Sequence, residues 1–403
     1  MTSQNKILRF TMFGLLYFTQ GTILGYFASL NAIYLLKNGL SIADVGIFST
    51  IALIPFIIKI LFGILSDRYN FLGWGHRKPY IVMGLLIQCI CLIVVMFINP
   101  GTQYWLFVGI AFLLQLGMAF YDTCTDGLAL DVTPADEKGI LQGFMVGGRS
   151  IGVIVAASVA GIIAESSWPG VFLFLAALTL LPFLLLFFIK EPERTPGMRF
   201  NWGAFRAFKK PVVLLVAAIG LIVFVVIVGA NQLVNPSLST RLEISTSTAG
   251  LLTTLWGIGC VAGALAGGRL MDRLGGKRAL WLSILSVAVT MVLIAIIPSL
   301  VVAYLVVILF GVAFGASQAI YFALAMQVTD GTIAASMYSI LMAVTNVGQG
   351  IGLGLGGGLA DAAGYPVAFL AFGGIIFLAV PFVIALYRRL RPRTKENIFQ
   401  AEL

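Results

Sequence analysis

The chain has 403 residues, of which 60% are hydrophobic and only 10% are charged. Because about 25% of the residues of a soluble domain are charged, this composition excludes a water-soluble globular protein and makes the lipid bilayer the predicted solvent. The formal net charge of +9 comes from basic residues dispersed over short loops, so no nucleic-acid partner is expected.

Apolar stretches long enough to cross a bilayer recur along the whole chain. A helix needs about 20 apolar residues to span hydrocarbon about 30 Å thick, and continuous rather than alternating runs predict helices instead of barrel strands. The first stretch is too long for a cleavable signal, contains Gln20 and leads directly into a second span. We therefore predict an all-α, multi-pass membrane protein with twelve transmembrane helices, at residues 7–36, 43–66, 79–98, 102–130, 139–164, 168–189, 211–236, 246–271, 279–298, 300–328, 333–360 and 364–387.

The basic residues give the orientation of these helices. If the N-terminus is cytoplasmic, all but four of the 25 Lys and Arg residues fall in inner loops and tails. Of the four exceptions, Lys37 and Arg241 lie in outer loops, and Lys59 and Arg149 lie inside apolar segments. The positive-inside rule therefore predicts that both termini are cytoplasmic.

Four charged residues lie inside the predicted spans of the N-terminal half: Lys59, Asp122, Asp126 and Arg149. At 1.5 Å per residue they lie about 8–15 Å from the cytoplasmic ends of their helices, and the two aspartates share one helix face. An ionised group in hydrocarbon costs about 2.5–3.5 kcal/mol, so we expect these groups to pair or to line a wet cavity. Two interpretations stay open. Repulsion between close carboxylates favours binding a proton, which suits ion coupling or substrate binding; alternatively, a static cluster locks helices 2, 4 and 5.

The longest polar stretch joins the sixth predicted helix to the seventh. Residues 190–210 contain prolines, which end helices, and mixed charges, which keep the segment at the membrane surface. No extra soluble domain fits elsewhere. We predict an N-terminal six-helix bundle at 1–190, a cytoplasmic linker at 191–210, a C-terminal six-helix bundle at 211–390 and a cytoplasmic tail at 391–403.

Glycines recur with a spacing of four in two helices of the C-terminal half. Small residues at this spacing let helices approach closely, so we predict tight packing, with sliding or bending during transport as the alternative. The predicted ladders are Gly259, Gly263 and Gly267 in helix 8, and Gly348, Gly352 and Gly356 with Gly350, Gly354 and Gly358 in helix 11.

One charged loop occurs twice, at matching places in the two halves. Gly63–Arg68 (Gly-Ile-Leu-Ser-Asp-Arg) is followed by His76-Arg77-Lys78, and Gly268–Arg273 (Gly-Arg-Leu-Met-Asp-Arg) is followed by Lys277-Arg278. This repetition predicts an internal duplication. The pattern Gly-x-x-x-Asp-Arg plus a basic cluster, in loops 2–3 and 8–9 of a 6+6 chain, resembles the major facilitator superfamily over essentially the whole chain.

This resemblance implies a carrier that works by alternating access, in which the loop aspartate ties helix 2 to a neighbouring helix end and holds one conformation. The gating role then falls on Asp67 and Asp272. Residues 69–75 separate Arg68 from the basic cluster in the first copy, which departs from the short form of the pattern. The alternative is that these charges are only topology anchors. The implied charge partners are Arg68, Arg77, Arg273 and Arg278, and Asp131, near the interface, is expected to partner the loop charges.

Two segments indicate a narrower resemblance. Residues 121–131 (Tyr-Asp-Thr-Cys-Thr-Asp-Gly-Leu-Ala-Leu-Asp) and 73–81 (Gly-Trp-Gly-His-Arg-Lys-Pro-Tyr-Ile) resemble the muropeptide permeases, acetyl-CoA transporters and light-harvesting assembly proteins. Residues 77–80 are also similar to the cation-coupled glycoside symporters. Helix 5 lacks the Gly-Pro signature of many drug/proton antiporters, which disfavours an exporter.

The resemblance also implies which helices line the cavity, namely 1, 4, 7 and 10. The alternative for their polar side chains is interhelical hydrogen bonding, worth about 0.6 kcal/mol each. The candidate substrate contacts are Gln20, Tyr121, Asp122, Asn231, Gln318 and Tyr321, with Asn346 of helix 11 near the same depth.

Several chemistries lack the residues that they need. A single loop histidine and no Cys/His cluster disfavour a metal site, and the four cysteines lie in predicted spans, which disfavours disulfides. No phosphate-binding Gly-Lys-Ser/Thr loop is present, and one histidine cannot build a Ser/His/Asp set. We expect no cofactor and no enzymatic activity.

We therefore expect a monomeric secondary carrier in a bacterial inner membrane, coupled to protons or Na⁺, that moves a sugar-containing, muropeptide-like or organic-anion solute. The alternatives are an exporter of amphipathic compounds and a non-transporting membrane assembly or pigment-handling protein.

Overall fold

The computed structural model describes residues 5–73, 75–188, 190–191, 202–244 and 246–390. The regular secondary structure of these ranges is helical, and twelve segments are long and apolar enough to cross a membrane, which confirms the predicted number. They are residues 6–29, 47–68, 78–95, 104–132, 135–166, 168–186, 211–242, 248–274, 276–295, 300–328, 331–363 and 365–389. Half of the predicted linker (192–201), the predicted tail and Trp74 lie outside the described residues.

The helices of the N-terminal half follow the predicted spans, with three local differences. The first stretch breaks at Leu30, the sixth is interrupted before Phe183 by Pro182, which cannot donate a helix hydrogen bond, and the fifth contains one π-helical turn. The elements are α1 (Lys6–Ser29), α2 (Asn31–Lys37), α3 (Ile42–Arg68), α4 (Lys78–Val95), α5 (Tyr104–Val132), α6 (Lys138–Val155), the π-helix η3 (Ala156–Ala160), α7 (Gly161–Ser166), α8 (Trp168–Leu180) and α9 (Phe183–Leu186).

The C-terminal half begins with a short 3₁₀-helix and continues with long helices. Its seventh span is longer than predicted, since α10 runs through Pro236 to Leu242. The elements are η5 (Trp202–Lys209), α10 (Pro211–Leu242), α11 (Thr246–Leu274), α12 (Gly276–Ala295), α13 (Leu300–Val328), α14 (Ala334–Ala363), α15 (Tyr365–Ile375), the 3₁₀-helix η7 (Ile376–Leu378) and α16 (Ala379–Arg389).

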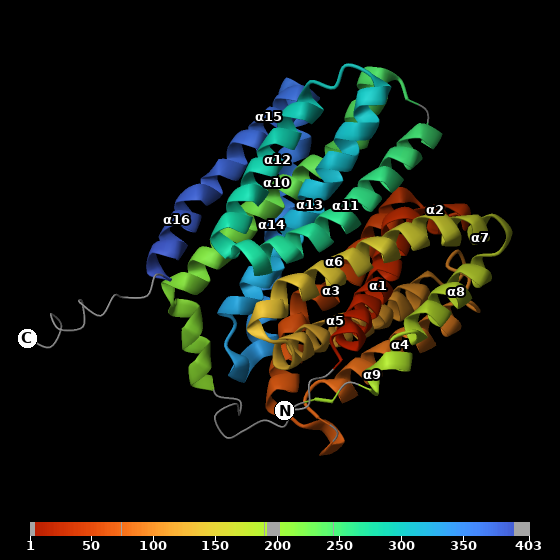
Figure 1. Ribbon diagram of the computed structural model, residues 1–403. Helices are drawn as coiled ribbons and strands as arrows, with labels where there is room; N and C mark the ends of the chain where they lie inside the picture. The colour runs from red at the N-terminus through yellow and green to blue at the C-terminus, as the bar shows by residue number, and fades with distance from the viewer. Residues whose placement is uncertain (1–4, 74, 189, 192–201, 245, 391–403) are drawn as a thin grey trace, which may run out of the picture.

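The helices gather in two groups (Figure 1). Within the red-to-yellow group, α1 packs on α6 and α4 packs on α5 and α8; within the green-to-blue group, α11 packs on α13 and α10 on α14 and α16. The groups meet where α6 contacts α11 and α13, and where α3 and α5 contact α14. The exact domain bounds stay a prediction.

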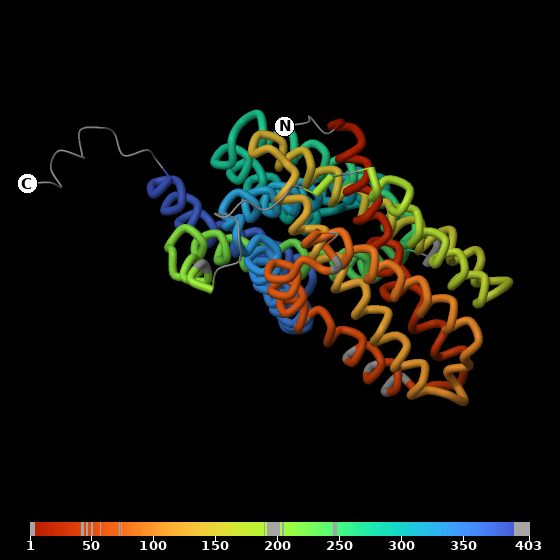
Figure 2. The backbone as a smooth tube through the Cα atoms, turned by 90° about the horizontal axis from the view of Figure 1, so that it is seen from below, coloured from red at the N-terminus to blue at the C-terminus, as the bar shows by residue number. Residues whose placement is uncertain are grey.

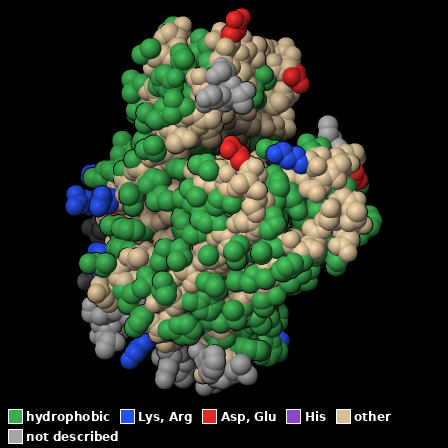
Figure 3. All heavy atoms as spheres, turned by 90° about the vertical axis from the view of Figure 1, so that its right-hand side faces the viewer, with side chains coloured by type: hydrophobic (Ala, Val, Ile, Leu, Met, Phe, Trp, Pro, Cys, Tyr) green, Lys and Arg blue, Asp and Glu red, His purple; other side chains and the backbone are tan. Residues whose placement is uncertain are grey.

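Contact between the two groups is closest at the end that the basic residues predict to be cytoplasmic. There the backbone of Gly268 approaches that of Gly139, and Gly63 approaches Ser336. Towards the other end of α14, Asn346, Val347 and Ile351 are exposed. In the space-filling view a recess separates the upper lobe from the body below it (Figure 3). The molecule is therefore closed at its predicted cytoplasmic end and open at the opposite end.

The glycine ladders divide into packed and open ones. A Cβ on Gly263 would lie 2.0 Å from the Val312 carbonyl oxygen of α13, and one on Gly352 would lie 2.2 Å from the Val225 carbonyl oxygen of α10. Close packing within the C-terminal group thus explains the ladders that contain them. The prediction was wrong for Gly350, Gly354 and Gly358, which have open space around the Cα atom because this face of α14 points away from α10.

Candidate functional site

Three helices of the N-terminal half converge on the carboxylate of Asp122. The Lys59 ammonium, from α3, lies 3.7 Å from Asp122 Oδ2, and both side chains are about 6% exposed. Gln20 Nε2, from α1, donates a hydrogen bond to Asp122 Oδ1 at 2.7 Å. The charge on α5 is therefore neutralised by α3 and oriented by α1.

Asp126 lies one turn further along α5 and has a different environment. Its Oδ1 accepts a 2.5 Å hydrogen bond from the Tyr17 hydroxyl, and both residues are buried. No Lys, Arg or His of the described chain lies within 4 Å of this carboxyl group. Asp126 is thus a buried carboxyl group with a phenol as its partner and no paired cation.

Arg149 reaches from α6 across to the C-terminal group. Its Nη2 donates a 2.5 Å hydrogen bond to Gln318 Oε1 of α13, and its guanidinium lies 5.6 Å from the centre of the Phe322 ring. It interacts electrostatically with Asp122 and Asp126, but no carboxylate in the described ranges lies within ion-pair distance of it. The guanidinium therefore joins the two helix groups through neutral partners.

The other predicted substrate contacts do not join this cluster. Tyr121 is buried where α5 packs on Gly84 of α4, and Tyr321 is buried against Gly220 of α10. Asn346 is exposed and accepts a hydrogen bond from Gln349. These three residues and Asn231 make no hydrogen bond or ion pair with Lys59, Asp122, Asp126 or Arg149. Gln20 and Gln318 are the predicted polar residues that the fold brings to the buried charges.

The first charged loop closes the predicted cytoplasmic end. Asp67, at the end of α3, is fully buried. Its Oδ1 accepts hydrogen bonds from Arg77 Nη2 at 2.6 Å and from the Ala335 backbone N–H at 3.3 Å. Its Oδ2 accepts from the backbone N–H and the hydroxyl of Ser336, at 2.9 and 2.5 Å. A carboxylate at a helix N-terminus is stabilised by the helix dipole, so Asp67 fastens α3 to the start of α14.

Arg77 organises the remaining polar groups of this loop. Its Nε donates to Asp131 Oδ2 at 2.9 Å and its Nη1 donates to the Ser66 hydroxyl at 2.7 Å. The carboxylate of Glu191 accepts from the backbone N–H groups of His76, Arg77 and Lys78, at 2.6, 3.1 and 3.2 Å. Glu191 therefore caps the start of α4 and fixes the backbone from which Arg77 extends.

The second charged loop closes the same end through backbone donors. Asp272, on α11, accepts from the N–H groups of Gly139 and Ile140 at 2.8 and 2.6 Å. Beside it, the Lys138 ammonium donates to the Met326 carbonyl at the end of α13, at 3.2 Å. The second contact thus joins the start of α6 to α11 and α13.

The predicted pairing of Arg68, Arg273 and Arg278 with the loop aspartates was wrong. All three are exposed and lie beyond ion-pair distance of every carboxylate in the described part of the chain. The reason is that the two oxygens of Asp272 face the backbone donors at the start of α6, and those of Asp67 face Arg77 and the start of α14. The Arg68 guanidinium lies instead 5.0 Å from the centre of the Tyr69 ring.

Tyr17, Ser336 and Glu191 are site residues that the sequence reasoning missed. Tyr17 precedes Gln20 by three residues, so the shared face of α1 was a usable signal. The contacts of Ser336 and Glu191 join segments far apart in sequence and gave no local signal. Among the described residues, no group of three His, Cys, Asp or Glu side chains is arranged to hold a metal ion.

Comparison with known proteins supports the same architecture. The sequence model of the Major Facilitator Superfamily matches residues 12–329 and 221–402. The chain is similar to the anhydromuropeptide permease of Escherichia coli K12, with 25% identity over 260 residues, 60% of this chain and 51% of that protein. It is also similar to the sialic acid transporter NanX of E. coli K12, with 26% identity over 264 residues, 61% of each chain. The chain thus spans about half the length of the permease that it matches.

A solved structure gives the fold. The E. coli fucose:proton symporter FucP has a TM-score of 0.76 at 16% identity, over 94% of this chain and 98% of that one. The twelve candidate spans of this protein are therefore arranged as in that transporter. The chain belongs to the Major Facilitator Superfamily and is a multi-pass membrane protein.

Proposed function

We propose that the protein is a proton-coupled symporter of an organic anion, with Asp126 as the proton-binding group and Arg149 as the anchor for the anion. One observation carries this proposal. Among the described residues, Asp126 is a buried carboxyl group with no cation within ion-pair distance. Arg149 is half-buried, interacts electrostatically with Asp126 and has no described carboxylate within ion-pair distance.

Asp126 suits reversible proton binding because its charge is not compensated locally. An ionised carboxylate at this depth costs several kcal/mol unless it is paired, and taking up a proton removes that cost. Asp122, in contrast, has Lys59 at 3.7 Å, which supports its charged form. The two carboxyl groups of α5 therefore have different roles: Asp122 stays paired with Lys59, and Asp126 binds and releases the proton.

Arg149 suits an anionic solute because a guanidinium binds a carboxylate through two parallel hydrogen bonds. Gln318 supplies one neutral acceptor in the present structure, which a carboxylate would replace with a stronger one. The names of two relatives, an anhydromuropeptide permease and a sialic acid transporter, favour a sugar-containing acid as the solute class.

In this proposal the solute and the proton enter from the open end while the contacts of Asp67 and Asp272 hold the other end closed. Loading both sites removes unpaired charge from the centre, which allows the two helix groups to rock and the closed end to open. The bacterial relatives and the distribution of basic residues favour an inner membrane with both termini in the cytoplasm.

Uptake by proteoliposomes tests the function. We would impose an inwardly directed proton gradient and offer labelled sugar acids, muropeptides, neutral sugars and other organic anions. We expect gradient-driven uptake of an anionic solute that falls at least about tenfold, or about 1.4 kcal/mol, in Arg149→Gln and in Asp126→Asn. The exposed Arg273→Gln is the matched control and should transport like the wild type. Uptake only of neutral solutes, or uptake that survives both central substitutions, would contradict the proposal.

A further inference from the structure

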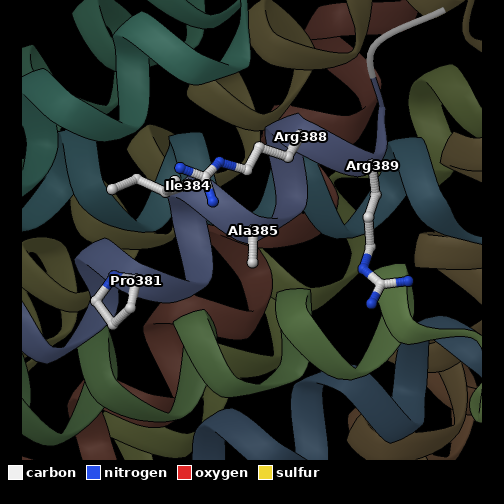
Figure 4. Close-up of a pocket in the computed structure, with 5 residues that line it drawn as sticks. All are labelled: Pro381, Ile384, Ala385, Arg388 and Arg389. Carbon is white, nitrogen blue, oxygen red and sulfur yellow. The ribbon is translucent and has the colours of Figure 1, made fainter. Parts of the chain in front are cut away.

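The last helix carries a small groove near its predicted cytoplasmic end (Figure 4). Pro381, Ile384 and Ala385 form its apolar wall, and Arg388 and Arg389 lie at the helix end. Both arginines are exposed. These five residues lie on one face of α16 and make a shallow apolar strip that ends in two guanidinium groups, which suits a molecule with an apolar chain and an anionic head.

A second basic segment lies beside this groove. Both ribbon views place the light-green η5 and the start of α10 next to the end of α16 (Figures 1 and 2), and α10 packs on α16. The rings of Trp202, Phe205 and Phe208 stack in series, with centres 5.7 and 6.2 Å apart. Residues three apart are eclipsed in a 3₁₀-helix, so the three rings form one apolar face of η5.

The positive charges of this region have no acidic partner among the described residues. Along the described chain, no carboxylate lies within ion-pair distance of the five basic side chains. A basic residue close to an anionic leaflet gains about 1 kcal/mol, and Trp side chains such as that of Trp202 favour the membrane interface. The basic side chains of this region are Arg206, Lys209, Lys210, Arg388 and Arg389.

We propose that this groove binds an anionic phospholipid of the cytoplasmic leaflet. The lipid phosphate lies against Arg388 and Arg389, one acyl chain runs along Pro381, Ile384 and Ala385, and η5 lies among the neighbouring headgroups. The apolar wall distinguishes a lipid from a free phosphate ion, which would use only the two arginines. This inference is independent of the transported solute, because no residue of α16 takes part in the described hydrogen bonds and ion pairs of the buried charges.

Lipid binding by the purified full-length protein tests the proposal. Native mass spectrometry would compare dioleoyl phosphatidylglycerol, dioleoyl phosphatidylcholine and inorganic phosphate, with the double substitutions Arg388→Gln/Arg389→Gln and Lys277→Gln/Arg278→Gln. We expect phosphatidylglycerol to bind more tightly than phosphatidylcholine, and its affinity to fall about fivefold for each groove charge removed. The Lys277/Arg278 variant removes two basic residues from another cytoplasmic loop and should bind as the wild type does.

A charge-preserving variant separates lipid binding from misfolding. Arg388→Lys/Arg389→Lys should keep most of the affinity for phosphatidylglycerol, and all variants should give the same thermal unfolding midpoint in lipid-free detergent. Equal affinity for the two lipids would overturn the proposal. So would an equal loss of binding in the two Gln double variants, or competition by inorganic phosphate as strong as that by the lipid.

Discussion

Lys59 and Asp122 form an ion pair that depends on both members. The two side chains are nearly fully buried, with Nζ and Oδ2 3.7 Å apart. Removing one member of a buried pair leaves an uncompensated charge and typically costs about 3–5 kcal/mol. We predict that Lys59→Met lowers the thermal unfolding midpoint in detergent, and that adding Asp122→Asn restores most of the loss. A double variant no more stable than Lys59→Met would contradict the pairing.

At the residue scale, the sequence alone predicted which charged residues lie inside the membrane spans, because their distance from the helix ends can be counted. These residues are Lys59, Asp122, Asp126 and Arg149. Sequence could not decide which charges pair, because pairing depends on helix rotation. The aspartates of α5 differ in environment although they share a face: one meets Lys59, and the other meets Tyr17. Tyr121 shows the same limit, since it adjoins Asp122 in the chain and yet packs towards α4.

The two closing contacts differ in strength at the scale of the helix. Asp67 is fully buried and binds three donors at the start of α14, whereas Asp272 is partly exposed and binds two at the start of α6. A hydrogen bond to a charged group contributes about 1.5–3 kcal/mol. We therefore predict that Asp67→Ala shifts the population towards opening of the cytoplasmic end by about tenfold or more, and that Asp272→Ala shifts it less.

Distances between spin labels at Arg68→Cys and Gly331→Cys, in a background without native cysteines, measure this shift. Both positions are exposed, and α3 lies close to the turn that contains Gly331. The control Ser336→Ala keeps the aspartate and loses one of its donors, so it should open less than Asp67→Ala. Unchanged distances in Asp67→Ala would show that this contact does not set the conformational balance.

Helix packing gives a paired prediction from two glycines. A methyl group on Gly263 would lie 2.0 Å from the Val312 carbonyl oxygen, whereas Gly354 has nothing within 4 Å of its added Cβ. Overpacking typically costs about 1–3 kcal/mol, so Gly263→Ala should lower the unfolding midpoint. Gly354→Ala should leave it unchanged or raise it slightly, because alanine favours a helix by about 1 kcal/mol over glycine. Equal effects of the two substitutions would contradict the packing of α11 on α13.

At the scale of helices, hydrophobic length predicted all twelve spans, because the bilayer imposes a length on any helix that crosses it. The break at Leu30 and the π-helical turn at Ala156–Ala160 were not predicted, since both lie inside apolar stretches that hydropathy treats as uniform. The same spacing of four also suggested a second packed glycine ladder in α14, formed by Gly350, Gly354 and Gly358. That ladder faces open space, because spacing does not say which face meets a neighbour.

The whole molecule combines one closed end, one open end and a group of four charges between them, of which Lys59 and Asp122 form an ion pair and Asp126 and Arg149 have no ion-pair partner among the described residues. At the closed end, Asp67 and Asp272 hydrogen-bond across the two helix groups. Further in, the hydrogen bond between Arg149 and Gln318 joins the same two groups. The repeated loop predicted the two halves, but no repeat of the buried charges exists in the C-terminal half. We infer that coupling belongs to the N-terminal group and that the C-terminal group supplies neutral partners.

The central claim is that Asp126 carries the coupled proton, and proton movement itself tests it most directly. Proteoliposomes containing a pH-sensitive dye would receive the transported anionic solute without an imposed gradient, with the wild type and Asp126→Asn side by side. Exchange of labelled for unlabelled solute would confirm that each protein is active. We predict solute-induced internal acidification in the wild type, and exchange without acidification in Asp126→Asn. Acidification of equal size in both proteins would contradict the account.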